Sequence, residues 1–432
     1  MGVDIKPFNP LRSFLPKGSP PMIDEDRLVD TTLLATTLSM DSLGSEAIRE
    51  DSLQGKIHQP IIPEDASLND SLPLLVDYSE SQSALSQLRS LLLEAKSQPL
   101  YIAFLGDSFI EGDILVGDFR QKLQDKYGGC GVGYVPMTSP VSRFRQTIKH
   151  RFGGAWKSAT LLHSGRFTLS GMYDHLSGDG FAEYDMIKGI PSLAHIHRAS
   201  IVYETNSEGM ITTTINDSII ETHILEATGS GVLSRLEVNY PQITSIKVEG
   251  NGEDINIHGV YLDGDRGVSV DNFSVRGSLG GDLLKVNSGL VNYMKGIRPY
   301  QLIVLSYGLN ALSTEENGDD YSWYYHKLKK SIQHLKSLYP DALFLILSVS
   351  DRATIMEGEV ITLPGVYQIR KHQIRLAREE GCLFWDTFSA IKRMGGIETM
   401  VQKGWAAKDY THFSGAGGRK LAELLYHSIV EE

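Results

Sequence analysis

The chain has 432 residues, of which 41% are hydrophobic and 22% charged, as is typical of a globular protein large enough for more than one packed unit. Its formal net charge of -12 argues against nucleic acid or an anionic membrane surface as the main partner, because like charges repel. Cys130 and Cys382 are its only cysteines, which excludes a disulfide framework and a multi-cysteine zinc site but leaves one bridge possible.

The first residues carry scattered Pro, Ser, Asp and Glu without a sustained helical or strand period. We therefore predict an extended or poorly ordered leader over 1–82. Residues 1–22 lack an apolar signal core, so an exported form would already have lost its signal from this sequence. No run in the chain has the roughly 18 apolar residues of a membrane span, so none is expected.

The segment 83–139 opens with leucines at helical spacing, which predicts a first helix. Residues 100–105 then form a short continuous apolar run, which is typical of a buried parallel strand. Ser108 follows in a tight turn, and an amphipathic helix is expected over 114–126. A strand, a turn that carries a serine and a helix make half of a βαβ unit, and they place the serine near the positive end of the helix.

The segment 140–267 has a different pattern, in which apolar and polar residues alternate and Asn, Gly and Asp mark the turns. This pattern predicts an antiparallel β-sandwich inserted into the chain. The alternating stretches are 199–204, 210–215, 218–224, 234–238, 244–248 and 255–261.

The segment 268–432 returns to alternating strands and helices. With the strand before Ser108, its strands indicate a doubly wound parallel sheet of five strands, so 83–139 and 268–432 would form one α/β domain. The expected strands are 268–274, 301–306, 342–348 and 382–385, and the expected helices are 283–295, 323–338, 366–380 and 415–429.

Polar residues follow several of these strands. Ser108 comes after the first strand, Gly277 after the second and Asn310 after the third, while Asp409 and His412 precede the last helix. Ligands of open α/β sheets bind outside the carboxyl ends of the strands, so these segments are predicted to converge on one rim.

The residue types suit acyl transfer. Ser108 would be the nucleophile, His412 the base that takes its proton, and Asp409 the carboxylate that orients the base. The backbone amides of Ser108 and Gly277 and the side-chain amide of Asn310 would donate to the oxyanion. No metal ligand set and no cofactor motif accompanies them, so neither a metal nor a cofactor is expected.

These segments resemble the four sequence blocks of the SGNH (GDSL-type) hydrolases. The corresponding blocks are Gly106-Asp107-Ser108, Gly277, Gly308-Leu309-Asn310 and Asp409-Tyr410-Thr411-His412. The resemblance implies a flavodoxin-like three-layer α/β/α fold and metal-free ester hydrolysis. The first block reads Gly-Asp-Ser-Phe rather than Gly-Asp-Ser-Leu, and Gly280 or Gly281 is an alternative to Gly277.

A β-sandwich between the serine and glycine blocks is similar to the layout of peptidoglycan and polysaccharide O-acetylesterases. That layout implies an exported (periplasmic or extracellular) serine esterase that removes small acyl groups, mainly acetyl, from peptidoglycan or another polysaccharide. Three alternatives remain: acyl transfer to a sugar, cleavage of lipid or thioester substrates, and carbohydrate binding with an idle triad.

Other polar motifs have simpler interpretations. Glu111 and Asp113 are expected at a solvated helix start. His195 and His197 are expected to be surface residues, since no third metal ligand accompanies them. The glycine-rich stretch 128–133 follows a helix instead of opening one, so it predicts a flexible connector rather than a phosphate site. Four aromatic residues of the insert are expected in its core or in a sugar-stacking platform; they are Trp156, Tyr173, Tyr184 and Tyr203.

Overall fold

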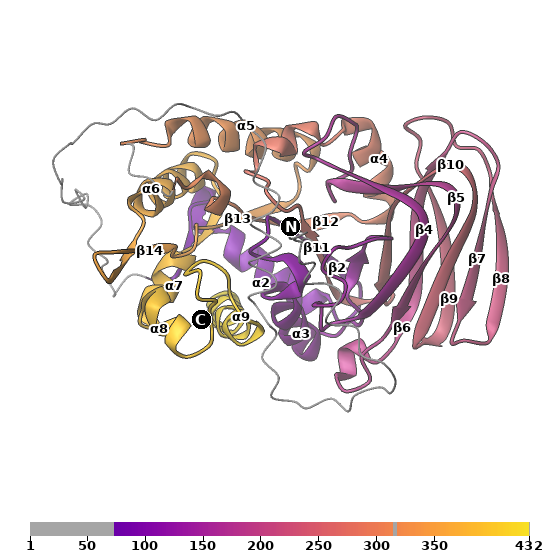
Figure 1. The fold of residues 1–432 in the computed structure, drawn as a ribbon, viewed down its shortest axis with the longest axis horizontal. Helices are drawn as coiled ribbons and strands as arrows, with labels where there is room; N and C mark the ends of the chain where they lie inside the picture. The colour runs from indigo at the N-terminus through magenta and orange to yellow at the C-terminus, as the bar shows by residue number, and fades with distance from the viewer. Residues whose placement is uncertain (1–72, 314–317, 432) are drawn as a thin grey trace, which may run out of the picture.

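The computed structural model describes residues 73–313 and 318–431. Figure 1 shows a central sheet surrounded by helices and, beside it, a second part made almost entirely of strands. Within the described ranges, no helix is both long enough and apolar enough to cross a membrane.

The central sheet, sheet A, contains five strands that pair in parallel. They are β2 (Pro99–Gly106), β11 (Gly267–Ser274), β12 (Tyr300–Ser306), β13 (Leu343–Leu347) and β16 (Leu383–Trp385). In space β2 lies between β11 and β12, so numbering these strands along the chain gives the order 2-1-3-4-5, as in flavodoxin-like sheets. From Leu100 onward every residue of β2 is buried, because helices cover both faces of the sheet.

A sixth strand makes sheet A mixed rather than purely parallel. β1 (Leu75–Asp77) pairs antiparallel with β16 at the edge of the sheet. These residues were assigned to the leader from the sequence, so the leader prediction is wrong for them. Residues 1–72 of the predicted leader lie outside the described residues.

Two groups of helices lie on opposite sides of the strands (Figure 1). On one side α3 packs against α9, and on the other side α5 packs against α6. The helices are α2 (Ala84–Glu94), α3 (Val116–Tyr127), α4 (Ser288–Ile297), α5 (Ser322–Leu338), α6 (Pro364–Glu379), α7 (Thr387–Arg393), α8 (Gly396–Gln402) and α9 (Gly415–Val430).

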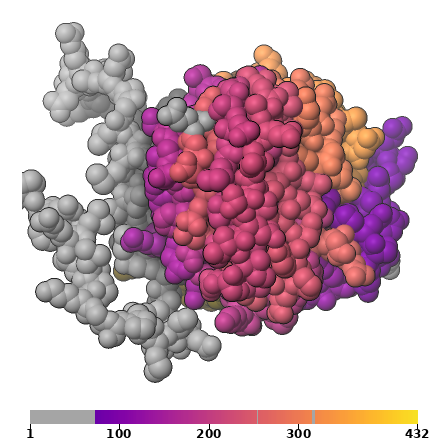
Figure 2. Space-filling model, turned by 90° about the vertical axis from the view of Figure 1, so that its right-hand side faces the viewer, coloured from indigo at the N-terminus to yellow at the C-terminus, as the bar shows by residue number. Residues whose placement is uncertain are grey.

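The second part, sheet B, has eight strands, and all of their pairings are antiparallel. Figure 2 shows its outer side as a broad, continuous surface. The strands are β3 (Gly133–Val135), β4 (Lys149–Thr160), β5 (Met172–Asp185), β6 (Ile196–Thr205), β7 (Gly209–Ile215), β8 (Ile219–Leu225), β9 (Ser234–Ile243) and β10 (Ser245–Asp263).

The long strand β10 connects all of sheet B. Its first part pairs with β5 and β7, and its second part pairs with β6 and β3. The antiparallel pairing agrees with the sequence analysis, but the strands form one hydrogen-bonded set, and two stacked sheets remain a prediction. Of the aromatic residues considered for sugar stacking, Tyr184 and Tyr203 are buried in the core of this part.

The glycine-rich stretch 128–133 is packed tightly between the two sheets. A Cβ added to Gly129 would lie 2.5 Å from the carbonyl oxygen of Val268, and both Gly129 and Gly133 have positive φ. The expected flexible connector is therefore a close contact that only glycine fits. Next to it, the backbone N–H of Tyr134 donates to Asp271 of β11 over 2.9 Å, which fixes sheet B against sheet A.

Candidate active site

Ser108 lies where the strand order of sheet A reverses. β2 ends at Gly106, and Ser108 is in the turn that follows. One neighbour of β2 is β11, and the other is β12, which Asn310 follows. Such a switch point is the place where open α/β sheets bind ligands. A Cβ on Gly106 would lie 2.9 Å from the carbonyl oxygen of Ser306, so the turn begins at a position where a larger residue would clash.

Ser108, His412 and Asp409 are brought together as the sequence analysis expects. The Ser108 Oγ lies 3.4 Å from His412 Nε2, and His412 Nδ1 lies 2.7 Å from Asp409 Oδ2. The first distance is long for a hydrogen bond, as is common in sites without substrate. The three side chains form a series in which a hydroxyl proton can move to the imidazole and the carboxylate can hold the imidazole in place.

The carboxylate of Asp409 is held by its own loop. Its Oδ1 accepts hydrogen bonds from the backbone N–H groups of Thr411 and His412, over 3.0 and 3.1 Å. Burial alone would raise the pKa of Asp409, but the hydrogen bond from His412 and the attraction to its ring outweigh burial and lower that pKa. Asp409 is therefore ionised at neutral pH and can accept a hydrogen bond from the Nδ1–H of His412.

The loop that carries Asp409 and His412 is fixed to its surroundings. Its carbonyl at Tyr410 accepts from the N–H of Ala353, and the carbonyl of His412 accepts from the N–H of Ala407. Tyr410 has a φ of 53°, a conformation that costs a non-glycine residue free energy and is typical of functional loops. Ser414 then caps α9 by accepting from the N–H of Gly417.

The predicted oxyanion donors are arranged differently from expectation. The side-chain amide of Asn310 donates to Asp107 over 2.9 Å and to the carbonyl oxygen of Ser278 over 3.1 Å. Both of its N–H groups are therefore engaged, and donation to an oxyanion requires it to share or release one of them. Gly277 lies in a turn with a φ of 80°, which is closed by a hydrogen bond from the N–H of Ser278 to the carbonyl of Val275.

The helix that follows Ser108 does not start beside it. A 3₁₀ turn at Glu111–Asp113 separates Ser108 from α3, which begins at Val116. We expected the positive end of this helix to stabilise the oxyanion, which requires a direct turn from strand to helix at Ser108. The structure does not have that direct turn.

Glu111 and Asp113 are not at a solvated helix start, so that prediction is wrong. Glu111 forms a 2.6 Å ion pair with Arg276, the residue before Gly277. Asp113 is fully buried and forms ion pairs with Arg120 and Arg145, over 3.0 and 2.8 Å. Burial raises the pKa of Asp113, but the two arginines outweigh it and hold that pKa far below its usual range. These ion pairs fasten the segment after the nucleophile to the rest of the molecule.

Asp107 is a site residue that the sequence analysis did not single out beyond its place in the motif. Its side chain is buried, and burial raises its pKa to about 7, although the N–H of Phe109 donates to it over 2.9 Å. The Asn310 amide donates to its other oxygen. A buried carboxyl group next to the candidate nucleophile in the chain thus binds the side chain of the candidate oxyanion donor.

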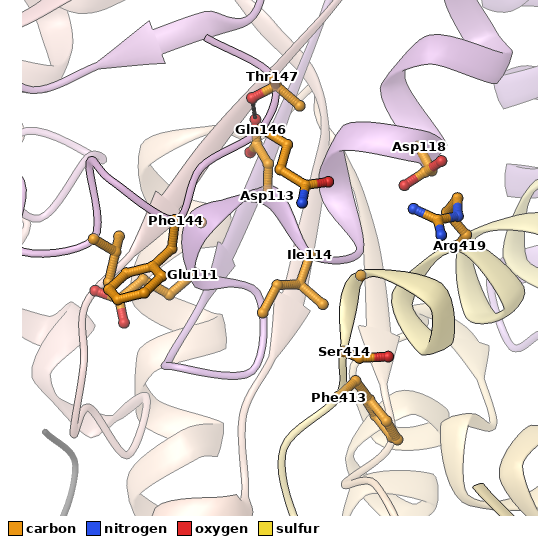
Figure 3. Close-up of a pocket in the computed structure, with 13 residues that line it drawn as sticks. Glu111, Asp113, Ile114, Asp118, Phe144, Gln146, Thr147, Phe413, Ser414 and Arg419 are labelled. Atoms are coloured by element: carbon orange, nitrogen blue, oxygen red, sulfur yellow. Dashed lines mark hydrogen bonds between the residues drawn. The ribbon is translucent and has the colours of Figure 1, made fainter. Parts of the chain in front are cut away.

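A cavity of about 60 Å³ lies beside the site (Figure 3). It is lined by residues shortly after Ser108, such as Ile114, and by Phe413, which follows His412. Phe144, from the segment that leads into sheet B, forms another part of its wall. Neither Ser108 nor His412 lines the cavity, so it flanks the reacting groups and does not contain them.

The remaining metal and cysteine candidates do not form sites. In the described part of the chain, no three His, Cys, Asp or Glu side chains are grouped to hold a metal ion. The rings of His195 and His197 meet edge to face, with centroids 5.2 Å apart. Cys130 and Cys382 are both free, and burial raises the pKa of each thiol to about 12. The one disulfide that the sequence left possible is therefore absent between these residues.

No protein-family model matches the chain, and no curated protein matches it in sequence. Among solved structures, a peptidoglycan O-acetylesterase is similar, with a TM-score of 0.66 and 22% identity, over 83% of this chain and 98% of that one. A salicylyl-acyltransferase from a tetracycline biosynthetic pathway has a TM-score of 0.29 and 13% identity, over 68% of this chain and 95% of that one.

A family two carbohydrate esterase from Clostridium thermocellum has a TM-score of 0.26 and 12% identity, over 65% of this chain and 98% of that one. These last two scores are too low to support a common overall fold. The likeness in fold therefore rests on the peptidoglycan O-acetylesterase, and it confirms, for the fold, the resemblance that the four sequence blocks indicated.

Proposed function

We propose that this protein is a serine esterase that removes small acyl groups, mainly acetyl, from a carbohydrate. The observation that carries the proposal is the hydrogen-bonded series from Ser108 through His412 to Asp409 at the switch point of sheet A. The fold shared with a peptidoglycan O-acetylesterase supports an ester of a saccharide as the substrate.

The reaction starts when Ser108 Oγ attacks the ester carbonyl carbon while His412 Nε2 takes the hydroxyl proton. The tetrahedral intermediate collapses, the C–O bond to the sugar breaks, and His412 returns the proton to the sugar oxygen. His412 then deprotonates a water molecule that attacks the acyl-enzyme, which releases the free acid and Ser108. Asp409 stabilises the imidazolium in both steps.

The negative charge of the intermediate needs hydrogen-bond donors. We assign this role to the backbone N–H groups of Ser108 and Gly277 and to the side-chain amide of Asn310. The ion pair between Glu111 and Arg276 joins the segment after Ser108 to the residue before Gly277, and so it would keep these donors aligned.

The substrate would be an acylated peptidoglycan or polysaccharide, reached by an exported enzyme in the periplasm or outside the cell. The inserted segment, 140–267, would contact the glycan or form one wall of the cleft. Phe144 supports this assignment, since it lies against the cavity beside the site (Figure 3).

Replacement of the nucleophile tests the proposal. We expect the wild type to hydrolyse p-nitrophenyl acetate faster than the butyrate and to release acetate from O-acetylated glycans. Ser108→Ala should abolish both activities without loss of fold, because this half-buried hydroxyl in a turn contributes little to packing.

Ser337→Ala, at an exposed position on α5, is the matched control and should retain full activity. Hydrolysis that persists in Ser108→Ala would remove Ser108 from the mechanism. If added acceptor alcohols outcompeted water in the products of the wild type, the enzyme would be a transferase instead.

A further inference from the structure

Arg352 lies between the two loops that carry the candidate catalytic groups. One guanidinium N–H donates to the carbonyl oxygen of Leu309, the residue before Asn310, over 3.2 Å. The next residue, Ala353, donates its N–H to the carbonyl of Tyr410, inside the loop from Asp409 to His412. The guanidinium is therefore at the rim of the site and not in the helical layers.

The backbone holds Arg352 in this place. It immediately precedes a two-stranded hairpin of β14 (Ala353–Met356) and β15 (Glu359–Thr362). The N–H of Leu363 donates to the Arg352 carbonyl over 2.9 Å and closes the base of the hairpin. The backbone of Arg352 is thus fixed, and its guanidinium is already held by Leu309, so the side chain loses less entropy when it binds a ligand than a free side chain would.

The guanidinium charge of Arg352 has no ion-pair partner among the residues that the structure describes. Within 73–313 and 318–431, no carboxylate lies within 4 Å of its guanidinium nitrogens. The carboxylate that acts on it electrostatically is Asp409, whose oxygens are already engaged by His412 and the loop backbone. Within the described residues the half-buried guanidinium thus has one carbonyl oxygen as its hydrogen-bond acceptor, and one carbonyl oxygen does not replace the hydration that a charge loses on burial.

We propose that Arg352 binds a carboxylate group of the substrate, so that the preferred substrate is an acylated saccharide that carries a carboxylate near its ester. This inference rests on the proposed esterase function. Arginine suits the role because its planar N–H groups match the two oxygens of a carboxylate. A fixed cation at the site also offsets the repulsion that a chain of net charge -12 exerts on an acidic glycan.

The carboxylate can belong to the sugar ring or to a peptide attached to the sugar. Three substrates distinguish these sources: an O-acetylated oligogalacturonide, an O-acetylated muropeptide and a neutral O-acetylated xylo-oligosaccharide. The wild type should prefer one of the two acidic substrates over the neutral one, as judged by kcat/KM for acetate release.

Arg352→Gln removes the charge and keeps most of the side-chain length. We expect it to lower the preference for the acidic substrate over the neutral one about 10- to 100-fold, mainly through KM, as for the loss of a charged hydrogen bond. Arg352→Lys should restore part of the preference, since it keeps the charge but not the planar pair of donors. Arg378→Gln is the control. Arg378 is exposed near the end of α6, where its guanidinium stacks on Tyr78. Its replacement removes the same charge and should leave the substrate preference unchanged.

Equal loss of activity on acidic and neutral substrates in Arg352→Gln would show a structural role and overturn the proposal, as would a wild type without preference for either acidic substrate. A failure of the esterase function is distinguishable, because binding can be measured without turnover. Calorimetry with oligogalacturonide and muropeptide on Ser108→Ala should detect binding that Ser108→Ala/Arg352→Gln lacks. Equal affinity of these two variants for both ligands would reject the inference whatever the enzyme hydrolyses.

Discussion

Asp107 is an ionisable group whose environment opposes its charge. The carboxyl is buried directly before Ser108, and it accepts hydrogen bonds from the Phe109 backbone and the Asn310 side chain. Burial is the largest influence, and it raises the pKa of Asp107 from 3.8 to about 7. The folded protein therefore binds this proton more tightly than the unfolded chain does.

This difference predicts a pH-dependent stability. The stabilising contribution of the bound proton is fully present below about pH 4 and is lost as the pH rises through about 7. A pKa change of this size corresponds to about 4 kcal/mol. The free energy of unfolding of the wild type, minus that of Asp107→Asn, should therefore fall by up to about 4 kcal/mol between pH 4 and pH 8. Urea unfolding of both proteins at each pH measures it.

Asp125→Asn, which alters an exposed carboxylate on α3, is the control and should follow the wild type across this range. A constant difference between wild type and Asp107→Asn would mean that Asp107 titrates as it does in the unfolded chain.

Asp409 acts through His412, so its replacement tests orientation rather than nucleophilicity. Asp409→Asn should keep the fold but favour the wrong imidazole tautomer, because an amide N–H would face Nδ1. We expect kcat for p-nitrophenyl acetate to fall by about 10⁴-fold while KM changes little. A fall of less than tenfold would assign the orienting role to another group.

At the scale of elements, the buried strands of sheet A were predictable because each is a short apolar run with helices over both of its faces. The expected strand at 100–105 lies within β2, and the one at 301–306 lies within β12. Ser108 and Asn310 could be placed near one another for the same reason, since they follow strands whose carboxyl ends share one edge. His412 was placed there from its position before the last helix.

The elements that were missed depend on distant partners. β1 is a strand because β16 pairs with it, and its two apolar residues, Leu75 and Val76, are too few to predict a strand from the sequence. The burial of Asp113 depends on Arg145, and the contact of Glu111 depends on Arg276, which is far away in sequence. Such partners are not visible in the local sequence, so the acidic residues Glu111 and Asp113 were predicted to be exposed to solvent.

At the scale of the molecule, sheets A and B are joined by a buried charge cluster. Arg298 is 2% exposed and bonds to Asp263, at the end of β10, and to Asp271, on β11. Tyr300 also donates to Asp271 over 2.7 Å. The desolvation of these charges is offset only while all partners are present.

We therefore expect Arg298→Met to lower the free energy of unfolding by about 3–5 kcal/mol, because Asp271 would stay buried without its ion-pair partner and Asp263 would keep only its ion pair with Arg198. Chemical denaturation measures the loss. Arg151→Met removes an exposed ion pair with Glu183 on sheet B and should cost less than about 1 kcal/mol. Similar losses in both variants would mean that the cluster does not stabilise the junction.

The order of the strands also determines when the site can exist during synthesis. Strand β2 precedes sheet B in the chain, but its neighbours β11 and β12 follow sheet B, and His412 lies 304 residues after Ser108. A growing chain thus contains its serine long before it contains the matching base. Until the loop before α9 has been made, Ser108 has no His412 to take its proton, so the proposed ester cleavage requires both parts of the α/β domain.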